Sequence, residues 1–198
     1  MGKHLIVLVL ASALAGAAQA EGLSWNYTQL GYQKPDNKDV EGIAGEMSVA
    51  IADNWVLQGG IGYIEDDGYN SQVYSQTRYD LLVGRVFPLS DNISLIASAG
   101  YTHVEYRERL TGGNDSSGFD AANLQFGVRG RFGQRFEADA QVGVLVDEDD
   151  VSDLLYELGL RYHMTDNVAV NLAIIGTEEE TSPDDVIYEL GFRFDLSD

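Results

Sequence analysis

The sequence predicts an all-β protein, an up-and-down antiparallel transmembrane β-barrel of about ten strands, with eight strands as the alternative count. Apolar and polar residues alternate with a period of two along most of the chain, as in strands with one apolar face. Short turns built on Asp-Asn recur at residues 52–55, 90–93 and 165–168. Short and longer connections alternate along the chain, so the repeating unit is a β-hairpin with its tight turn at one end of the barrel.

Residues 1–20 are predicted to be a cleaved secretory signal, followed by a barrel domain over residues 21–198. Lys3 precedes an apolar run from Leu5 to Ala17, which is shorter than the ~20 residues that a membrane-spanning helix needs. Ala18-Gln19-Ala20 then fits the small-residue rule for signal peptidase. The chain has no cysteine, which excludes a lipid anchor on cysteine, and its net charge of −20 excludes phosphate-directed binding of nucleic acid.

The alternation predicts strands over the ranges 23–33, 40–51, 55–65, 74–87, 93–108, 119–132, 135–146, 153–164, 168–177 and 185–195. Short connections are predicted at 52–54, 88–92, 133–134 and 165–167, and longer ones at 34–39, 66–73, 109–118, 147–152 and 178–184. Asp and Asn suit the short turns because they tolerate left-handed backbone. The segment YELGLRY at 156–162 returns as YELGFRF at 188–194, and the second copy is predicted to be the strand that closes the barrel.

Alternation alone allows two orientations of the apolar face. A soluble periplasmic barrel that binds a ligand turns it inward, and a membrane barrel turns it outward to lipid. Glycines share the charged face at 127, 143, 159 and 191, where they would make room for charged side chains in a crowded interior. Aromatic residues gather near the short turns (Trp55, Phe87, Phe132, Phe136, Tyr162, Phe194) and near the longer connections (Tyr63, Tyr79, Tyr101, Tyr156, Tyr188). Two such belts favour the membrane orientation.

The signal segment, the hairpin series and the last strand resemble the OmpA/OmpX-like, porin-family outer-membrane barrels. The resemblance implies that Gly191, Phe192 and Phe194 form an assembly signal that the barrel assembly machinery reads. The chain departs from the family pattern because residues 195–198 follow the last aromatic residue. The resemblance also implies a location in the outer membrane of a Gram-negative bacterium, in contact with lipid and lipopolysaccharide.

The polar face predicts a charged interior. Its residues are Glu46, Gln58, Asp80, Arg129, Arg131, Glu137, Asp139, Glu157, Arg161, Glu189 and Arg193. Buried charges need partners, so these side chains are expected to form a salt-bridged plug, and a narrow water-filled pore is the alternative. Arg161 and Arg193 hold equivalent positions in the two copies of the repeat, which predicts a ladder in which Glu157 and Glu189 pair with arginines on neighbouring strands.

Catalysis is not predicted. Only His103 and His163 follow the signal segment, both are expected at the rim, and no serine-hydrolase or metal-type spacing accompanies them. No cofactor is expected. Asp147, Asp149 and Asp150 are candidate metal ligands in an acidic loop, whose other interpretation is a solvated, repulsive surface. Divalent cations bridging the acidic loops to lipopolysaccharide phosphates, and direct phosphate contacts by Arg107 and Arg109, are a further hypothesis.

The sequence therefore predicts a non-catalytic outer-membrane barrel that acts in envelope structure or surface interaction. A narrow passive channel for small solutes or ions is the alternative.

Overall fold

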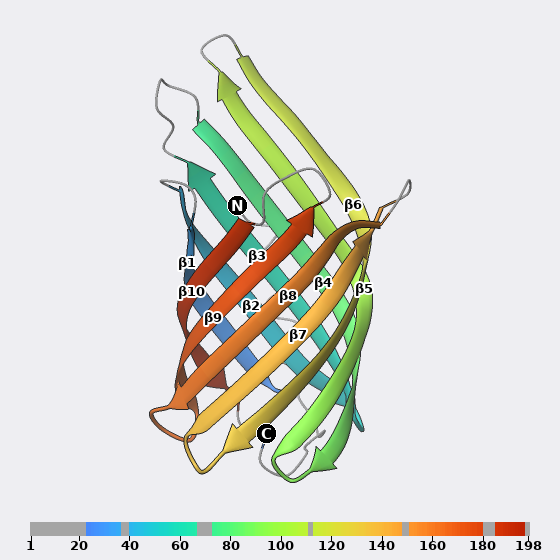
Figure 1. The fold of residues 1–198 in the computed structure, drawn as a ribbon, viewed down its shortest axis with the longest axis vertical. Coiled ribbons are helices and arrows are strands. Elements are labelled where there is room, and N and C mark those ends of the chain that lie inside the picture. Colours follow the sequence, from blue (N-terminus) through green and yellow to red (C-terminus); the bar gives the residue numbers. More distant parts are fainter. Residues whose placement is uncertain are drawn as a thin grey trace.

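A computed structural model describes residues 23–36, 40–66, 73–110, 113–147, 151–179 and 185–196. These residues form a closed antiparallel barrel in which each strand pairs with its neighbours in the chain and β1 pairs with β10 (Figure 1). The strands are β1 (Tyr27–Pro35), β2 (Val40–Ala52), β3 (Trp55–Asp66), β4 (Val73–Ser90), β5 (Ile93–Leu110), β6 (Gly113–Phe132), β7 (Phe136–Val146), β8 (Val151–His163), β9 (Val168–Glu179) and β10 (Asp185–Asp195). The predicted up-and-down barrel is confirmed with ten strands, and the alternative count of eight is wrong.

The short turns lie together at one end of the barrel, as predicted (Figure 1). Asn54 has a φ of 60° and Gly133 a φ of 65°, the left-handed backbone that tight hairpin turns need. The turn expected over 88–92 is shorter than predicted, because Pro88 still pairs with Ser94 as part of β4. No helix among the described residues is long and apolar enough to cross a membrane.

The apolar face of the barrel points outward. On β6, Phe126 is 51% exposed, whereas its lumen-facing neighbour Asn123 is fully buried. On β7, Val142 is 55% exposed and Glu137 is fully buried. The aromatic residues predicted for the two belts all stand at outward positions of their strands, exposed or half-buried. A soluble barrel with an apolar interior is therefore excluded.

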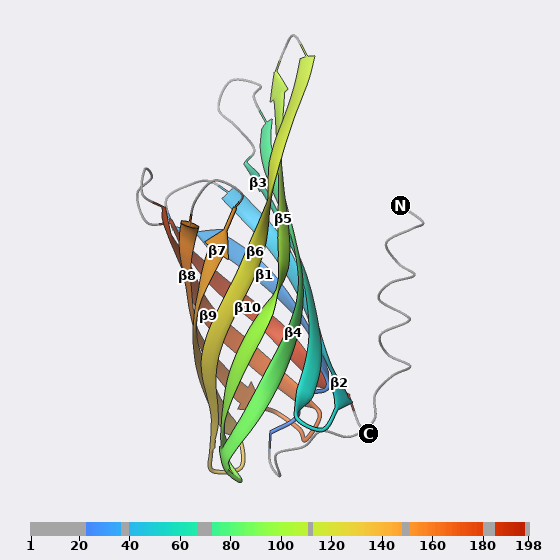
Figure 2. The ribbon, with the colours of Figure 1, turned by 90° about the vertical axis from the view of Figure 1, so that its right-hand side faces the viewer.

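Strands β4, β5 and β6 are longer than predicted. The loop expected over 109–118 is a paired hairpin, because the β5–β6 ladder continues to the pair Leu110–Gly113. Glycine, serine and charged residues there obscured the strand pattern, but main-chain pairing does not depend on those side chains. Figures 1 and 2 show β5 and β6 rising above the rest of the barrel at the end away from the short turns.

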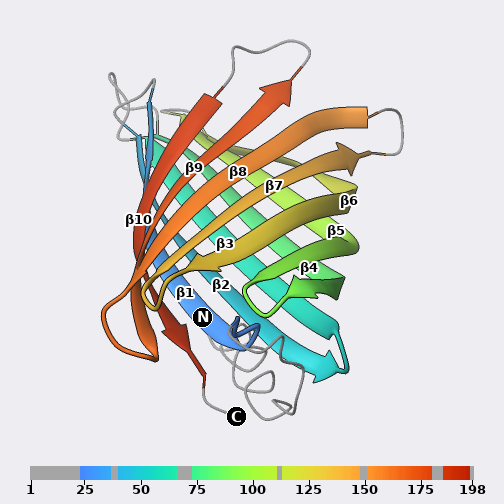
Figure 3. The same cartoon turned by 60° about the horizontal axis from the view of Figure 1, so that its bottom comes forward.

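The start of the described chain lies inside the barrel at the short-turn end (Figure 3). Residues 23–26 were expected in the first strand, but the strand begins at Tyr27. Leu23 and Trp25 are 1% and 4% exposed, and Trp25 packs with Val56, Val86 and Ile96. The prediction was wrong because the alternating apolar residues of this segment fill the lumen and do not face lipid.

Candidate functional site

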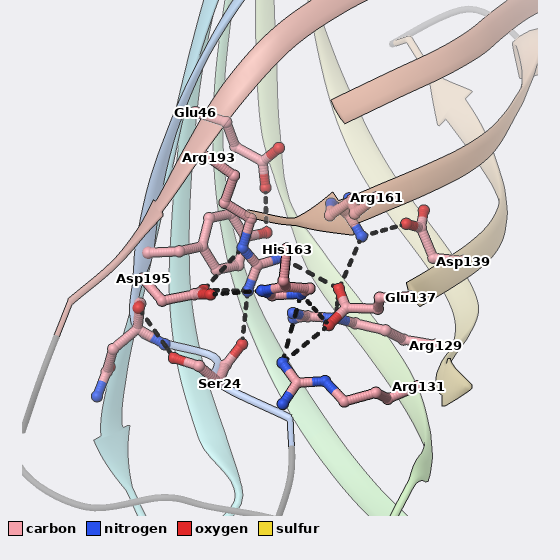
Figure 4. Close-up of polar contacts among 12 residues, drawn as sticks. Ser24, Glu46, Arg129, Arg131, Glu137, Asp139, Arg161, His163, Arg193 and Asp195 are labelled. Carbon is pink, nitrogen blue, oxygen red and sulfur yellow. Dashed lines mark hydrogen bonds and ion pairs between the residues drawn. The ribbon is translucent and has the colours of Figure 1, made fainter. Parts of the chain in front are cut away.

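The charged residues of the short-turn half of the lumen converge on Glu137 of β7, whose side chain is fully buried (Figure 4). Its Oε1 lies 2.6 Å from Nε of Arg129, 3.1 Å from Nη1 of Arg161 and 3.5 Å from Nη1 of Arg193. Its Oε2 lies 3.6 Å from Nη2 of Arg131. A single carboxylate thus contacts arginines from three different strands, β6, β8 and β10. We call these five residues the Glu137 cluster.

The strand register explains why several arginines contact this carboxylate. Glu137 stands directly opposite Arg131 on β6 and opposite Arg161 on β8. Asp139, two residues along on the same face, stands opposite Arg129 and also contacts Arg161. Directly opposed side chains on one face of a sheet are close enough to interact. Arg193 reaches the cluster from β10, across the lumen.

His163 belongs to this interior, not to the rim as predicted. Its side chain is 4% exposed, with Nε2 3.5 Å from Glu137 Oε2 and Nδ1 3.7 Å from Asp195 Oδ2. The backbone N–H of Leu196 donates to the carbonyl oxygen of Asn26 at 2.8 Å, so chain segments cover this end and turn an expected rim position into an interior one. The signal that was missed is parity, because His163 shares the inward face of its strand with Arg161.

Asp195 also belongs to the interior, although the sequence marked it as an addition beyond the family pattern. Its Oδ1 accepts hydrogen bonds from Arg193 Nε at 2.9 Å and lies 2.8 Å from Arg193 Nη2. The same Nη2 donates to the carbonyl oxygen of Ser24 at 2.7 Å, which ties the segment before β1 to the last strand. The Arg193 guanidinium lies 3.7 Å from the ring centre of Tyr27, and the Tyr27 hydroxyl donates to Glu46 Oε1 at 2.5 Å.

Packing around the Trp25 ring completes the closure of the short-turn half. The guanidinium of Arg129 lies 4.9 Å from the ring centre of Trp25. Trp25 in turn packs with side chains of β3, β4 and β5. The Glu137 cluster together with this packing forms what we call the floor of the lumen.

Above the floor, the other half of the lumen contains a cavity of about 550 Å³. Its lining includes the carboxylates of Glu46, Asp80, Asp139, Glu157 and Glu189 and the amides of Gln29, Gln33, Gln58, Gln76, Gln125 and Gln141. Asp80 pairs with Arg78 at 2.9 Å, and Asp139 contacts Arg161. Thr102 Oγ1 donates to Asp80 Oδ1 at 2.6 Å, and Gln58 Oε1 accepts from Ser98 Oγ at 2.9 Å.

The predicted ladder of Glu157 and Glu189 with arginines is not present among the described residues. Glu189 accepts hydrogen bonds from the amides of Gln29 and Gln33, each at 3.0 Å, and from Asn171 at 3.4 Å. The register is the reason. Glu189 stands opposite Gln33 and Ala173, and Glu157 stands opposite Gln141 and Ile175, so no arginine stands opposite either carboxylate.

Glycines make room for two of these carboxylates. A Cβ on Gly159 would lie 2.5 Å from Oδ1 of Asp139, and a Cβ on Gly31 would lie 2.5 Å from Cδ of Glu189. Real Cβ atoms do not approach that closely, so each carboxylate occupies the space that the glycine beside it leaves. Of the four glycines for which this was expected, only Gly159 adjoins a carboxylate. A Cβ on Gly127, Gly143 or Gly191 would first meet the backbone of Ala140, the side chain of Gln125 or the backbone of Leu30.

An aromatic row lines the cavity at the end of the longer connections, and the sequence reasoning missed it. Tyr74 of β4 and Tyr106 of β5 have ring centres 6.1 Å apart, and Tyr106 and Phe119 of β6 have ring centres 6.4 Å apart. Pairwise register on three adjacent strands brings these residues side by side. Their inward parity was the available signal, because the predicted strands 74–87, 93–108 and 119–132 include all three residues.

Two of the remaining candidate residues, His103 and Arg107, lie outside the lumen. His103 stands on the outer surface, with Nδ1 2.6 Å from Asp120 Oδ1 and its ring stacked on Tyr79. Arg107, 66% exposed at its side chain, pairs with Glu105 at 2.9 Å. Asp147 ends the described stretch after β7, and Asp149 and Asp150 lie outside the described residues. Within the described ranges, no three His, Cys, Asp or Glu side chains are placed to hold a metal ion.

The residues of the expected assembly signal lie on the seam of the barrel. Gly191 stands opposite Gly31 of β1, and a Cβ on it would lie 2.3 Å from the carbonyl oxygen of Leu30. Phe192 and Phe194 are 50% and 40% exposed on the outer surface.

Comparisons with known proteins find the same barrel architecture. The chain matches the family described as outer membrane protein beta-barrel domain over residues 5–194. Among solved structures, it resembles the NanC porin (TM-score 0.56, 12% identity, covering 85% of this chain and 100% of that chain). It also resembles the KdgM porin (TM-score 0.50, 9% identity, covering 86% and 99%). The attachment invasion locus protein Ail of Yersinia pestis matches with a TM-score of 0.44 and 14% identity, covering 87% and 100%. At these identities the likeness shows the fold alone, and no curated protein matches the chain.

Proposed function

We propose, from the premise that the chain belongs to the outer membrane protein beta-barrel domain family, that it acts as a closed, non-catalytic barrel in envelope structure or surface contact. Family membership confirms the predicted resemblance to outer-membrane barrels. In such barrels the short turns face the periplasm and the longer connections face outward. The floor then lies on the periplasmic side, and the extended β5–β6 hairpin lies outside the cell.

One observation carries the proposal: the carboxylate of Glu137 and the guanidinium of Arg193 are both fully buried in the lumen. An open water-filled pore would hydrate such groups. At the floor, paired charges of both signs occupy the lumen.

The test is conductance. The purified chain in a planar lipid bilayer is expected to show no steady current. The double variant Arg161→Ala/Arg193→Ala is expected to leak small ions or to unfold at lower urea concentration, because it removes two partners of Glu137. Arg107→Ala, on the outer surface, is the matched control and should behave as the wild type. Frequent, stable openings in the wild type would contradict the closed barrel.

A narrow passive channel is the second candidate, and the cavity of about 550 Å³ favours it. Conduction would require the floor to move, because Trp25 and the Glu137 cluster lie between the cavity and the short-turn end. A current that appears in the wild type and increases in Trp25→Ala would support this candidate.

Contact with lipopolysaccharide is the form of surface interaction that we propose for the outer end. Arg107 is exposed on the extended part of β5, where its guanidinium can bind phosphate. Copurified lipopolysaccharide should decrease in Arg107→Glu and, if divalent cations bridge the acidic loops, also after chelation with EDTA.

A further inference from the structure

We propose that the cavity above the floor binds an extended organic cation, an aliphatic polyamine in chemical class, which enters from the extracellular end. This goes beyond a role in envelope structure, and it does not require passage through the barrel.

The first argument is an excess of acceptors in the cavity wall. Glu46 is bonded to the Tyr27 hydroxyl, Glu189 is bonded to amides, and neither has an arginine partner among the described residues. Glu157 lines the cavity and has no hydrogen bond or ion pair to a described side chain. Asp139, Glu46 and Glu189 repel its charge, and Arg161 is the positive group that attracts it. Carboxylates removed from water need a positive partner or hydrogen-bond donors.

The second argument comes from a neutral side chain beside these carboxylates. Gln29 is 5% exposed and lines the cavity, its amide nitrogen donates to Glu189, and its Oε1 has no partner. Buried acceptors are normally satisfied. The group that satisfies acceptors of both kinds is an ammonium, which carries donors and no acceptor.

The spacing of the carboxylates favours an extended cation over a metal ion. Glu46, Glu157 and Glu189 come from β2, β8 and β10, and no three acidic or histidine side chains of the described residues are placed to hold a metal. A chain with separated ammonium groups can meet each carboxylate in turn. The cavity volume of about 550 Å³ lies within the ~300–1,000 Å³ of ordinary small-molecule sites.

The two ends of the cavity fit the same ligand. The aromatic row Tyr74, Tyr106 and Phe119 lines the extracellular end, and aromatic rings attract ammonium groups. At the other end the cavity meets Arg129, Arg161 and Arg193, which repel a cation. The charge distribution therefore admits a polyamine and stops it at the floor.

The experiment is a calorimetric titration of spermine into the purified barrel in a zwitterionic detergent at low ionic strength. We expect saturable binding that weakens about tenfold in Glu157→Gln and further in Glu157→Gln/Glu189→Gln. Tetraethylene glycol, an uncharged chain of similar length, should not bind. Asp53→Asn, at an exposed turn on the periplasmic end, and the loop variant Asp147→Asn/Asp149→Asn/Asp150→Asn control for binding to surface carboxylates and should keep the wild-type affinity.

The proposal is overturned if the wild type shows no saturable binding, if Glu157→Gln binds as tightly as the wild type, or if the loop variant loses as much affinity as Glu157→Gln. If the double variant does not fold, Glu157→Gln alone decides the question. This single variant should fold, because Glu157 has no hydrogen bond to a described side chain that the substitution would remove. The conductance test of the closed barrel is a separate measurement, so polyamine binding can be disproved without disproving the closed barrel, and the reverse.

Discussion

The same strands line both halves of the lumen, but the carboxylates of one half are paired with arginines and those of the other half are not. In the short-turn half, Glu137 meets four arginines and a histidine, and the side chains pack closely around it. In the half near the longer connections, Glu157 and Glu189 face a cavity without an arginine partner among the described residues. Alternation along a strand decides which residues point inward. Pairing across strands decides whether inward charges close the barrel or leave a polar cavity.

The first prediction removes the central carboxylate of the closed half. Glu137→Gln keeps the shape of the side chain but leaves Arg129, Arg161 and Arg193 without their shared partner. Breaking a buried ion pair from one side costs ~3–5 kcal/mol, and the free energy of unfolding in urea should fall by about that amount. Glu105→Gln, on the outer surface, is the matched control and should change little. A urea midpoint equal to that of the wild type would show that the cluster does not stabilise the barrel.

The second prediction uses three successive residues of β10 that alternate between lumen and lipid. Arg193 and Asp195 point inward, and Phe194 points outward near the short-turn end. Phe194→Asp removes ~2 kcal/mol of apolar burial in lipid and one aromatic residue of the expected assembly signal. We expect several-fold less protein in the outer membrane, with accumulation and degradation in the periplasm, measured by immunoblot of membrane fractions. Asp198→Ala should leave the level unchanged. Wild-type levels of the Phe194 variant would argue against the assembly role.

Much of the wall could be predicted from the sequence because alternation and turn chemistry are local. Asn54 and Gly133 lie in left-handed turns, and the outward placement of Phe126 and Val142 follows from parity alone. The local pattern failed at residues 23–26, where Leu23 and Trp25 alternate as in a strand but lie in the lumen before β1 begins at Tyr27. It failed again at Gly113, where polar residues continue a strand.

The interior could be predicted only in part because its contacts depend on register between strands. Inward charges were identified by parity, but the partner of Glu189 is set by the residue opposite it on β1, Gln33. The parity of His163 marks it as inward, but nothing local indicates that residues 23–26 and Leu196 cover that end of the barrel. Such contacts join residues far apart in the chain, and no single segment encodes them.

The third prediction tests how closely the wall of the closed half is packed. Gly159→Ala would place a Cβ 2.5 Å from Oδ1 of Asp139, which must then move relative to Arg161. Overpacking of this kind costs ~1–3 kcal/mol, so the urea midpoint should fall. Gly45→Ala is the matched control, because its Cβ would meet Leu30 Cδ2 at an ordinary 3.5 Å, and it should change stability by no more than ~0.5 kcal/mol. Equal effects of the two variants would mean that Asp139 has free space to shift.

The last prediction has the smallest effect and the most direct bearing on the contrast between the halves. Glu157→Gln removes a carboxylate, as Glu137→Gln does, but in the half where no described arginine partners it. Repulsion from Asp139, Glu46 and Glu189 is relieved, attraction to Arg161 is lost, and no hydrogen bond to a described side chain is lost. The free energy of unfolding at neutral pH should therefore stay level or rise by up to ~1 kcal/mol. Added spermine should stabilise the wild type more than this variant, since a ligand that binds only the folded state raises its stability. A fall of several kcal/mol in Glu157→Gln, similar to that in Glu137→Gln, would show that both halves depend on paired charge and that the contrast between them is wrong.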